Sequence, residues 1–105
     1  MDKERIILQE KSNDGQTINL YYDVMAGVYL AYGLSAYYTT LITEPYLSYS
    51  DEMNMPVALL RKEHILYLRQ SSRKEEHEMK SYYRFILKSS VGDGGYDKWI
   101  QKHYA

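Results

Sequence analysis

Three observations predict a small α+β (or mixed α/β) fold for this chain. A strong turn signal separates two apolar runs near the N-terminus, a long uncharged stretch follows, and apolar residues after position 72 recur at helical spacing. The chain has 105 residues and no linker or internal repeat, so we expect one domain over residues 1–105. The expected elements are an N-terminal β-hairpin, a central buried helix, further short strands and two C-terminal helices.

The hairpin is expected at the start of the chain. Residues 5–11 read RIILQEK and have the apolar centre of a strand, and residues 16–22 alternate apolar and polar side chains. The turn between them contains Asp14-Gly15. This dipeptide is a strong hairpin signal, because glycine takes a positive φ without steric cost.

The central helix is expected over residues 24–42, which carry no charge. A membrane span, two strands and a buried helix compete for this stretch. Its four tyrosines argue against a span, since phenols favour the membrane interface, and its alanines and glycines argue against strands. We favour the helix, with Asp23 as its N-cap. Gly27 and Gly33 each lower helix stability by about 1 kcal/mol, so they predict close approach by another backbone.

The secondary structure of the middle of the chain is less clearly indicated by the sequence. Pro45 is expected to end the central helix, and residues 46–50 alternate like a short strand. Residues 56–68 leave three alternatives: a helix from Pro56, a hairpin, or a strand at 57–60 followed by a short helix. We favour strands.

Two helices are expected at the C-terminus. Ser72 and Glu75 have the spacing of a capping box, and an apolar stripe follows them, which predicts a helix over residues 73–88. The glycine-rich residues 92–95 end it, and a last short helix is expected over residues 96–103.

The sequence contains no specific catalytic or cofactor motif, so we predict no catalytic residue, metal or cofactor. The absence of cysteine excludes disulfides and thiolate chemistry. Four consecutive metal-ligand types run from Glu75 to Glu78, but helical neighbours point in different directions, and a solvated acidic face is favoured. Residues 92–95 lack the spacing of nucleotide-binding loops. The charged N-terminus carries no export signal, so we expect a cytoplasmic protein.

Tyrosine and charge point to a binding function. The chain has 13 Tyr against one Phe and one Trp, and Tyr is frequent at binding surfaces. Residues 1–52 hold three Lys and Arg against eight Asp and Glu, whereas residues 53–105 hold ten against six. Cations interleaved with aromatic rings suit nucleic acid, because charges contact phosphates and rings stack on bases. The candidate binding residues are Arg84, Lys88, Lys98, Trp99, Lys102, Tyr82 and Tyr83.

We therefore predict a non-catalytic binding module whose partner is nucleic acid or a nucleic-acid-handling protein. One alternative is a homo-oligomeric protein-interaction or structural module in which exposed tyrosines pair chain with chain. The second alternative is a small ligand-binding protein or enzyme, which would have a closed pocket lined by Tyr around one His or carboxylate.

Residues 16–68 also resemble the N-terminal, mismatch-recognition-type domain of the MutS family. The similarity rests on Leu20-Tyr21-Tyr22 followed by residues 25–30, which read MAGVYL. It covers about half of the chain and implies a related mixed α/β fold.

The same resemblance extends to Met55-Pro56, which is similar to the proline-containing strand that precedes a helix in that family. The mismatch-reading Phe and Glu of the family would fall on Val28 and Leu30. Neither side chain can stack on a base in the same way or accept a base proton. The resemblance therefore implies the fold without mismatch reading, and no functional residue is carried over.

Overall fold

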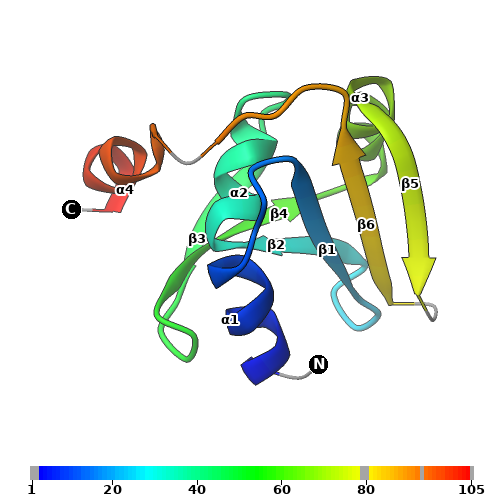
Figure 1. Ribbon diagram of the computed structural model, residues 1–105. Helices are drawn as coiled ribbons and strands as arrows, with labels where there is room; N and C mark the ends of the chain where they lie inside the picture. The colour runs from blue at the N-terminus through cyan, green and yellow to red at the C-terminus, as the bar shows by residue number, and fades with distance from the viewer. Residues whose placement is uncertain (1–2, 79–80, 93, 105) are drawn as a thin grey trace.

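A computed structural model describes residues 3–78, 81–92 and 94–104, and it confirms the α+β class. The described residues form four helices and six strands (Figure 1). The helices are α1 (Lys3–Lys11), α2 (Gly33–Thr40), α3 (Lys62–Ser71) and α4 (Tyr96–Tyr104). The strands are β1 (Thr17–Asp23), β2 (Val28–Tyr32), β3 (Tyr46–Ser50), β4 (Met55–Leu60), β5 (Ser72–Glu78) and β6 (Tyr82–Leu87). No helix in these ranges is long and apolar enough to cross a membrane.

The strands form one sheet in the order β3-β4-β2-β1-β6-β5, with every neighbouring pair antiparallel. β1 and β2 pair only near their connecting loop, from Tyr21↔Leu30 to Asp23↔Val28, and then separate. α2 packs against β1, β2 and β4 beyond this point. The backbone N–H of Asn19 consequently donates to the Ser35 hydroxyl of α2 at 2.9 Å. A side chain of α2 thus replaces the missing strand partner.

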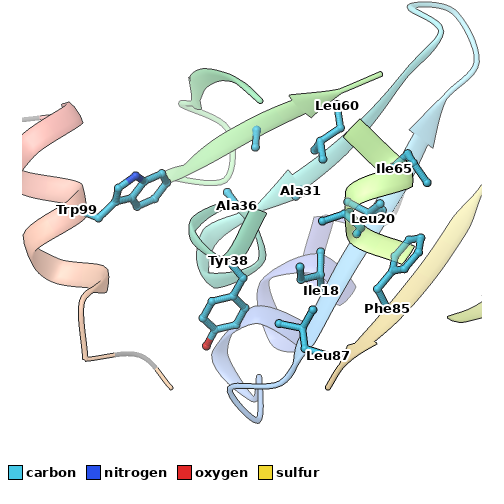
Figure 2. Packing of buried hydrophobic residues seen from close by; sticks show 12 residues of the cluster. Ile18, Leu20, Ala31, Ala36, Tyr38, Leu60, Ile65, Phe85, Leu87 and Trp99 are labelled. Carbon is cyan, nitrogen blue, oxygen red and sulfur yellow. The ribbon is translucent and has the colours of Figure 1, made fainter. Parts of the chain in front are cut away.

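Alternation along the strands produces two hydrophobic clusters. The larger cluster includes Ile18, Leu20 and Phe85, which are fully buried, together with residues of α2, α3 and α4 (Figure 2). The smaller cluster contains Ile6 of α1 and lies on the other side of the sheet, with Tyr21 among its members. Burial of each large apolar side chain contributes about 1.5–3 kcal/mol.

The N-terminal hairpin prediction is wrong in its first strand. Residues 5–11 belong to α1, whose buried residues are Ile6 and Glu10. These two are four residues apart and therefore lie on one face of a helix. Asp14-Gly15 does form a turn, in which Gly15 has a φ of 81°, but the turn joins α1 to β1 and does not connect the two strands of a hairpin. The predicted strand over residues 16–22 is confirmed as β1.

The helix predicted over residues 24–42 is confirmed only in its second half. It is wrong for residues 28–32, which form β2 because β1 and β4 pair with them on both sides. Only Gly33–Thr40 is helical, and five of its eight residues are buried. Asp23 does not cap it. Its carboxylate accepts the N–H groups of Met25 (3.0 Å) and Ala26 (3.2 Å) in the loop before β2. An Asx turn and an N-cap use the same short-range hydrogen bonds, so the sequence signal did not distinguish them.

The two glycines of this stretch serve different purposes. Gly27 has a φ of 69° in the β1–β2 loop, and a Cβ there would meet nothing within 4 Å, so the predicted close approach is wrong for it. Gly33 has a φ of 56° at the junction between β2 and α2. A Cβ at Gly33 would lie 3.3 Å from the Glu10 Cβ and 3.4 Å from the Met55 sulfur, so the close contact at Gly33 is with side chains and not, as was predicted, with another backbone.

The predicted strand over residues 46–50 is confirmed as β3, and residues 57–60 lie in β4. The preference for a second strand after residue 60 is wrong, because α3 follows, as the third alternative proposed. Ile65 and Leu68 are its buried residues, at the spacing of one helical turn.

The helix predicted over residues 73–88 is wrong. This segment forms the antiparallel hairpin of β5 and β6, so one C-terminal helix, α4, is present where two were expected. Ser72 does not begin a helix, since its hydroxyl donates to the Leu68 carbonyl at 2.6 Å at the end of α3. Glu75, the expected capping partner, instead accepts hydrogen bonds from Arg69. The pairing of β6 with β1 overrides the local helical pattern.

Candidate functional site

The predicted binding residues do not form one surface. Tyr82, Tyr83 and Arg84 lie on β6 and Lys88 follows it, whereas the other three lie on α4. Figure 1 shows α4 and β6 on different parts of the molecule. Tyr82 is 5% exposed and Trp99 is 8% exposed. These two rings therefore belong to the core and do not offer a face for stacking, whereas Lys88, Lys98 and Lys102 are exposed.

Tyr82 contributes to a buried polar network. Its hydroxyl donates to Asn19 Oδ1 at 2.6 Å, and the guanidinium carbons of Arg5 and Arg84 lie 4.9 and 5.9 Å from its ring centre. Arg84 Nη1 also lies 3.4 Å from Glu76 Oε1. Arg84 therefore has partners within its own chain.

Glu10 is the centre of this network and was not identified from the sequence. Its carboxylate is 3% exposed. Oε1 accepts the Ser35 N–H (2.8 Å) and the Asn13 amide (3.3 Å), and Oε2 accepts the Ser35 hydroxyl (2.7 Å) and the Asn19 amide (3.1 Å). Desolvation raises the pKa of Glu10 above its usual range, against the opposing effect of these hydrogen bonds. The network joins α1, β1 and α2.

A second group of aromatic residues lies on the opposite face of the sheet. Tyr22 and Tyr29 are cross-strand partners with ring centres 4.9 Å apart. The Tyr29 and Tyr83 rings meet edge to face at 5.4 Å, and His77 lies 4.4 Å from Tyr83. The rings form a row across β2, β1, β6 and β5, which we call the aromatic row. The three tyrosines are half-buried and His77 is exposed, so the row is open to a partner.

A groove continues the aromatic row toward α3. Its volume is about 480 Å³, and it is lined by Tyr29, Lys62, Glu63, Ile65, Leu66 and Arg69. Leu66 is 57% exposed, although it borders this groove. The groove and the row share Tyr29. The groove lining combines this ring and the aliphatic Ile65 and Leu66 with charged residues, which we call the rim: Lys62, Glu63 and Arg69.

Charges around the groove are balanced. Arg69 Nε and Nη2 lie 2.8 and 3.2 Å from the two carboxylate oxygens of Glu75, which His77 also contacts. Hydrogen bonding from Arg69 lowers the pKa of Glu75, and burial raises the pKa of Tyr29. The rim adds Lys62 and Glu63, so the site holds two cations and two carboxylates.

The predicted acidic face between Glu75 and Glu78 is rearranged by the strand. Glu75 and His77 oppose Phe85 and Tyr83, which belong to the face of the aromatic row, whereas Glu76 alternates to the other face. Over the described ranges, no group of three or more metal-ligand side chains is close enough to hold an ion.

Tyr83 is the one predicted residue in the candidate site. Tyr22 and Tyr29 were missed, although they flank the loop that begins at Asp23, and recognition of that loop as a hairpin turn would have paired them. Leu66 and Arg69 were also missed. They are three residues apart and lie on the same side of α3, so they line the groove together only because this segment is helical.

Comparisons with protein-family models, with curated proteins and with solved structures found no match to this chain. The resemblance of residues 16–68 to the MutS family therefore stays a prediction.

Proposed function

We propose that this chain is a non-catalytic protein-interaction module that holds a segment of a partner protein in the groove beside the aromatic row. The observation that carries the proposal is the continuity of Tyr22, Tyr29 and Tyr83 with a groove bordered by the exposed Leu66. Tyrosine rings bury a large area with little loss of side-chain entropy, and hot spots in interfaces are rich in Tyr and Arg. An apolar side chain of the partner would occupy the groove, and its backbone would contact the phenol groups and the charged rim.

Charge balance favours a protein over the nucleic acid that the sequence suggested. A nucleic-acid groove needs cations along the path of the phosphates. The groove is lined by Glu63 as well as by Lys62, and Arg69 is already held by Glu75. Tyr82 and Trp99, which would stack on bases in that prediction, are buried. The experiment below also tests binding of nucleic acid.

The chain offers a matched pair of variants on α3. Leu66 and Tyr67 are adjacent and are 57% and 53% exposed, but only Leu66 lines the groove. A random peptide library displayed on phage would be selected against the chain, and the enriched peptides synthesised. We expect Tyr29→Ala and Leu66→Ala to weaken their binding at least about tenfold, the loss of roughly one interface hot spot. Tyr67→Ala should leave it unchanged.

Three results would contradict the proposal. The selection could enrich no peptide, or Tyr67→Ala could weaken binding as much as Leu66→Ala. In the third, a single-stranded oligonucleotide would bind more tightly than any peptide, with affinity falling steeply as salt rises. That result would restore nucleic acid as the partner. Unfolding curves of each variant, followed by circular dichroism, show whether a lost interaction reflects lost structure.

A further inference from the structure

The two edges of the sheet differ in chemistry. β5 is one edge, and its sequence SRKEEHE contains five charged residues besides histidine, a common protection against edge-to-edge association. β3 is the other edge, and its sequence YLSYS carries no charge. Its Tyr46, Leu47 and Tyr49 are 61%, 37% and 41% exposed. β3 is therefore a short edge strand without charged side chains. Tyr104 of α4 contacts the Tyr49 ring at 5.7 Å but leaves it 41% exposed.

The direction of the backbone groups in β3 follows from the register of the sheet. The Tyr22 N–H donates to the Ser81 carbonyl at 2.7 Å, so the backbone N–H and C=O of Tyr22 point toward β6. The backbone groups of successive residues in an antiparallel strand point to opposite sides in the plane of the sheet. The backbone groups of Tyr21 therefore point toward β2, where Tyr21 opposes Leu30. The backbone groups of Leu30 point back toward β1, so those of the next residue of β2, Ala31, point toward β4.

The same alternation continues to the edge. Ala31 opposes Ala58, so the backbone groups of Ala58 point toward β2. Those of its neighbour Val57 therefore point toward β3, where Val57 opposes Ser48. Ser48 therefore directs its backbone groups inward. Leu47 and Tyr49 direct their N–H and C=O groups outward, where the sheet has no further strand.

We propose that β3 pairs antiparallel with β3 of a second copy of this chain, centred on Ser48, and joins the two six-stranded sheets into one. In this register Leu47 lies opposite Tyr49 of the second copy, and the reverse pair is identical by the two-fold symmetry. Each pair exchanges backbone hydrogen bonds in both directions, so every outward N–H and C=O of Leu47 and Tyr49 is used. Ser48 lies on the axis, opposite itself.

Pro45 disfavours one of the two neighbouring registers. Moving one strand by two residues would place Leu47 opposite itself and Pro45 opposite Tyr49, and proline has no N–H to donate. In the proposed register the Leu47 and Tyr49 side chains form cross-strand pairs of an apolar residue with an aromatic ring. The small Ser48 side chains meet on the other face without crowding.

The chemistry of the edges favours a second copy's β3 over its β5. Pairing with β5 would desolvate charged side chains, such as Arg73 and Lys74, beside an apolar strand. Glu44 and Glu52, both exposed, flank β3 and would approach each other across the dimer. Their repulsion is screened by salt, so association should strengthen as salt rises. A basic peptide bound to the same edge would show the opposite dependence.

Cross-linking tests the register directly, because the chain has no cysteine of its own. In a non-hydrogen-bonded antiparallel pair the Cα atoms are about 4.5 Å apart, which permits a disulfide. We expect Ser48→Cys to form a disulfide-linked dimer under mild oxidation. Leu47→Cys is the matched control, since its two copies would be about 7–8 Å apart. We expect it to cross-link about tenfold more slowly.

Sedimentation of the unmodified chain tests the association itself. We expect a monomer–dimer equilibrium that shifts toward dimer at high protein concentration and at high salt. Leu47→Pro removes an outward N–H while leaving the internal ladder intact, so it should abolish the dimer without changing the circular dichroism of the monomer. A monomer at every concentration, equal cross-linking of Ser48→Cys and Leu47→Cys, or association weakened by salt would each overturn the proposal. Failure of peptide binding at the groove would not affect it, because the groove and β3 share no residue.

Discussion

Glu10 shows how one residue can connect several elements. Its carboxylate accepts the N–H of Ser35 in the first turn of α2, while Tyr32 at the N-cap makes no side-chain capping bond. A side chain from α1 therefore caps α2, and the negative charge lies at the end of the helix where its dipole is positive. The partners are 25 residues apart in sequence, so no local motif announces the contact.

Replacement of Glu10 tests this capping. Glu10→Ala leaves the Ser35 N–H and the Asn19 amide buried without an acceptor, which should lower the free energy of unfolding by about 2–4 kcal/mol. Denaturant unfolding at neutral pH would measure the loss. A change below about 0.5 kcal/mol would show that these donors find other partners.

The raised pKa of Glu10 predicts a pH dependence of stability. An acid whose pKa is higher in the folded state binds its proton more tightly there, so folding is favoured at low pH. The contribution of Glu10 should be complete below about pH 4.3, its ordinary pKa, and should decline as pH rises through its folded value. Unfolding free energies measured across this range should show the decline. Glu10→Gln, which cannot ionise, should remove that part of the slope.

At the scale of elements, the sequence did not decide whether short apolar runs form helices or strands. Residues 5–11 and 73–88 each contain apolar positions compatible with either period, and tertiary contacts decided between them. β6 is held as a strand because β1 and β5 pair with it on both sides, whereas α1 has no strand partner and buries one face, with Ile6 and Glu10. β1, β3 and α4 were predictable because period, turn signals and flanking residues agreed.

Docking of α4 depends on a small residue before it. A Cβ at Gly95 would overlap the Tyr37 hydroxyl, whereas a Cβ at Gly94 would meet nothing within 4 Å. Tyr37 also contacts Trp99, with ring centres 5.5 Å apart. We expect Gly95→Ala to cost about 1–2 kcal/mol and to shift the fluorescence of Trp99, the sole tryptophan, toward that of an exposed indole. Gly94→Ala is the matched control, and an equal effect of both variants would show that Tyr37 does not limit the contact.

At the scale of the whole molecule, tyrosine is the main aromatic residue of both clusters, and Phe85 is the one phenylalanine of the chain. Tyr21, Tyr32 and Tyr82 belong to the smaller cluster, and Tyr38 and Phe85 are among the largest fully buried side chains. Phenol rings supply apolar area, and the hydroxyls of Tyr82 and Tyr21 also donate hydrogen bonds, to Asn19 and Gln9. The Tyr-rich composition is therefore partly a property of the core and partly a property of the aromatic row.

Burial of these phenols predicts alkaline unfolding. Desolvation raises the pKa of Tyr96 to about 12 and raises the pKa values of Tyr21, Tyr32, Tyr29 and Tyr104. A phenol with a raised folded pKa favours folding below its ordinary pKa of about 10, and that contribution is lost as pH rises further. Titration followed by tyrosinate absorbance should show exposed phenols ionising first and the buried ones together with unfolding. A single transition near the ordinary pKa would contradict this.

The sequence by itself determined the α+β class, β1, β3 and α4. These conclusions depend on composition and on local patterns whose turn chemistry and period agree. Only the tertiary structure decided whether the runs near α1 and β6 became helix or strand, because burial against a neighbour outweighs local preference there. It also decided the aromatic row, the capping by Glu10 and the outward direction of Leu47 and Tyr49. Each of these depends on strand register, which brings residues together that are far apart in the sequence.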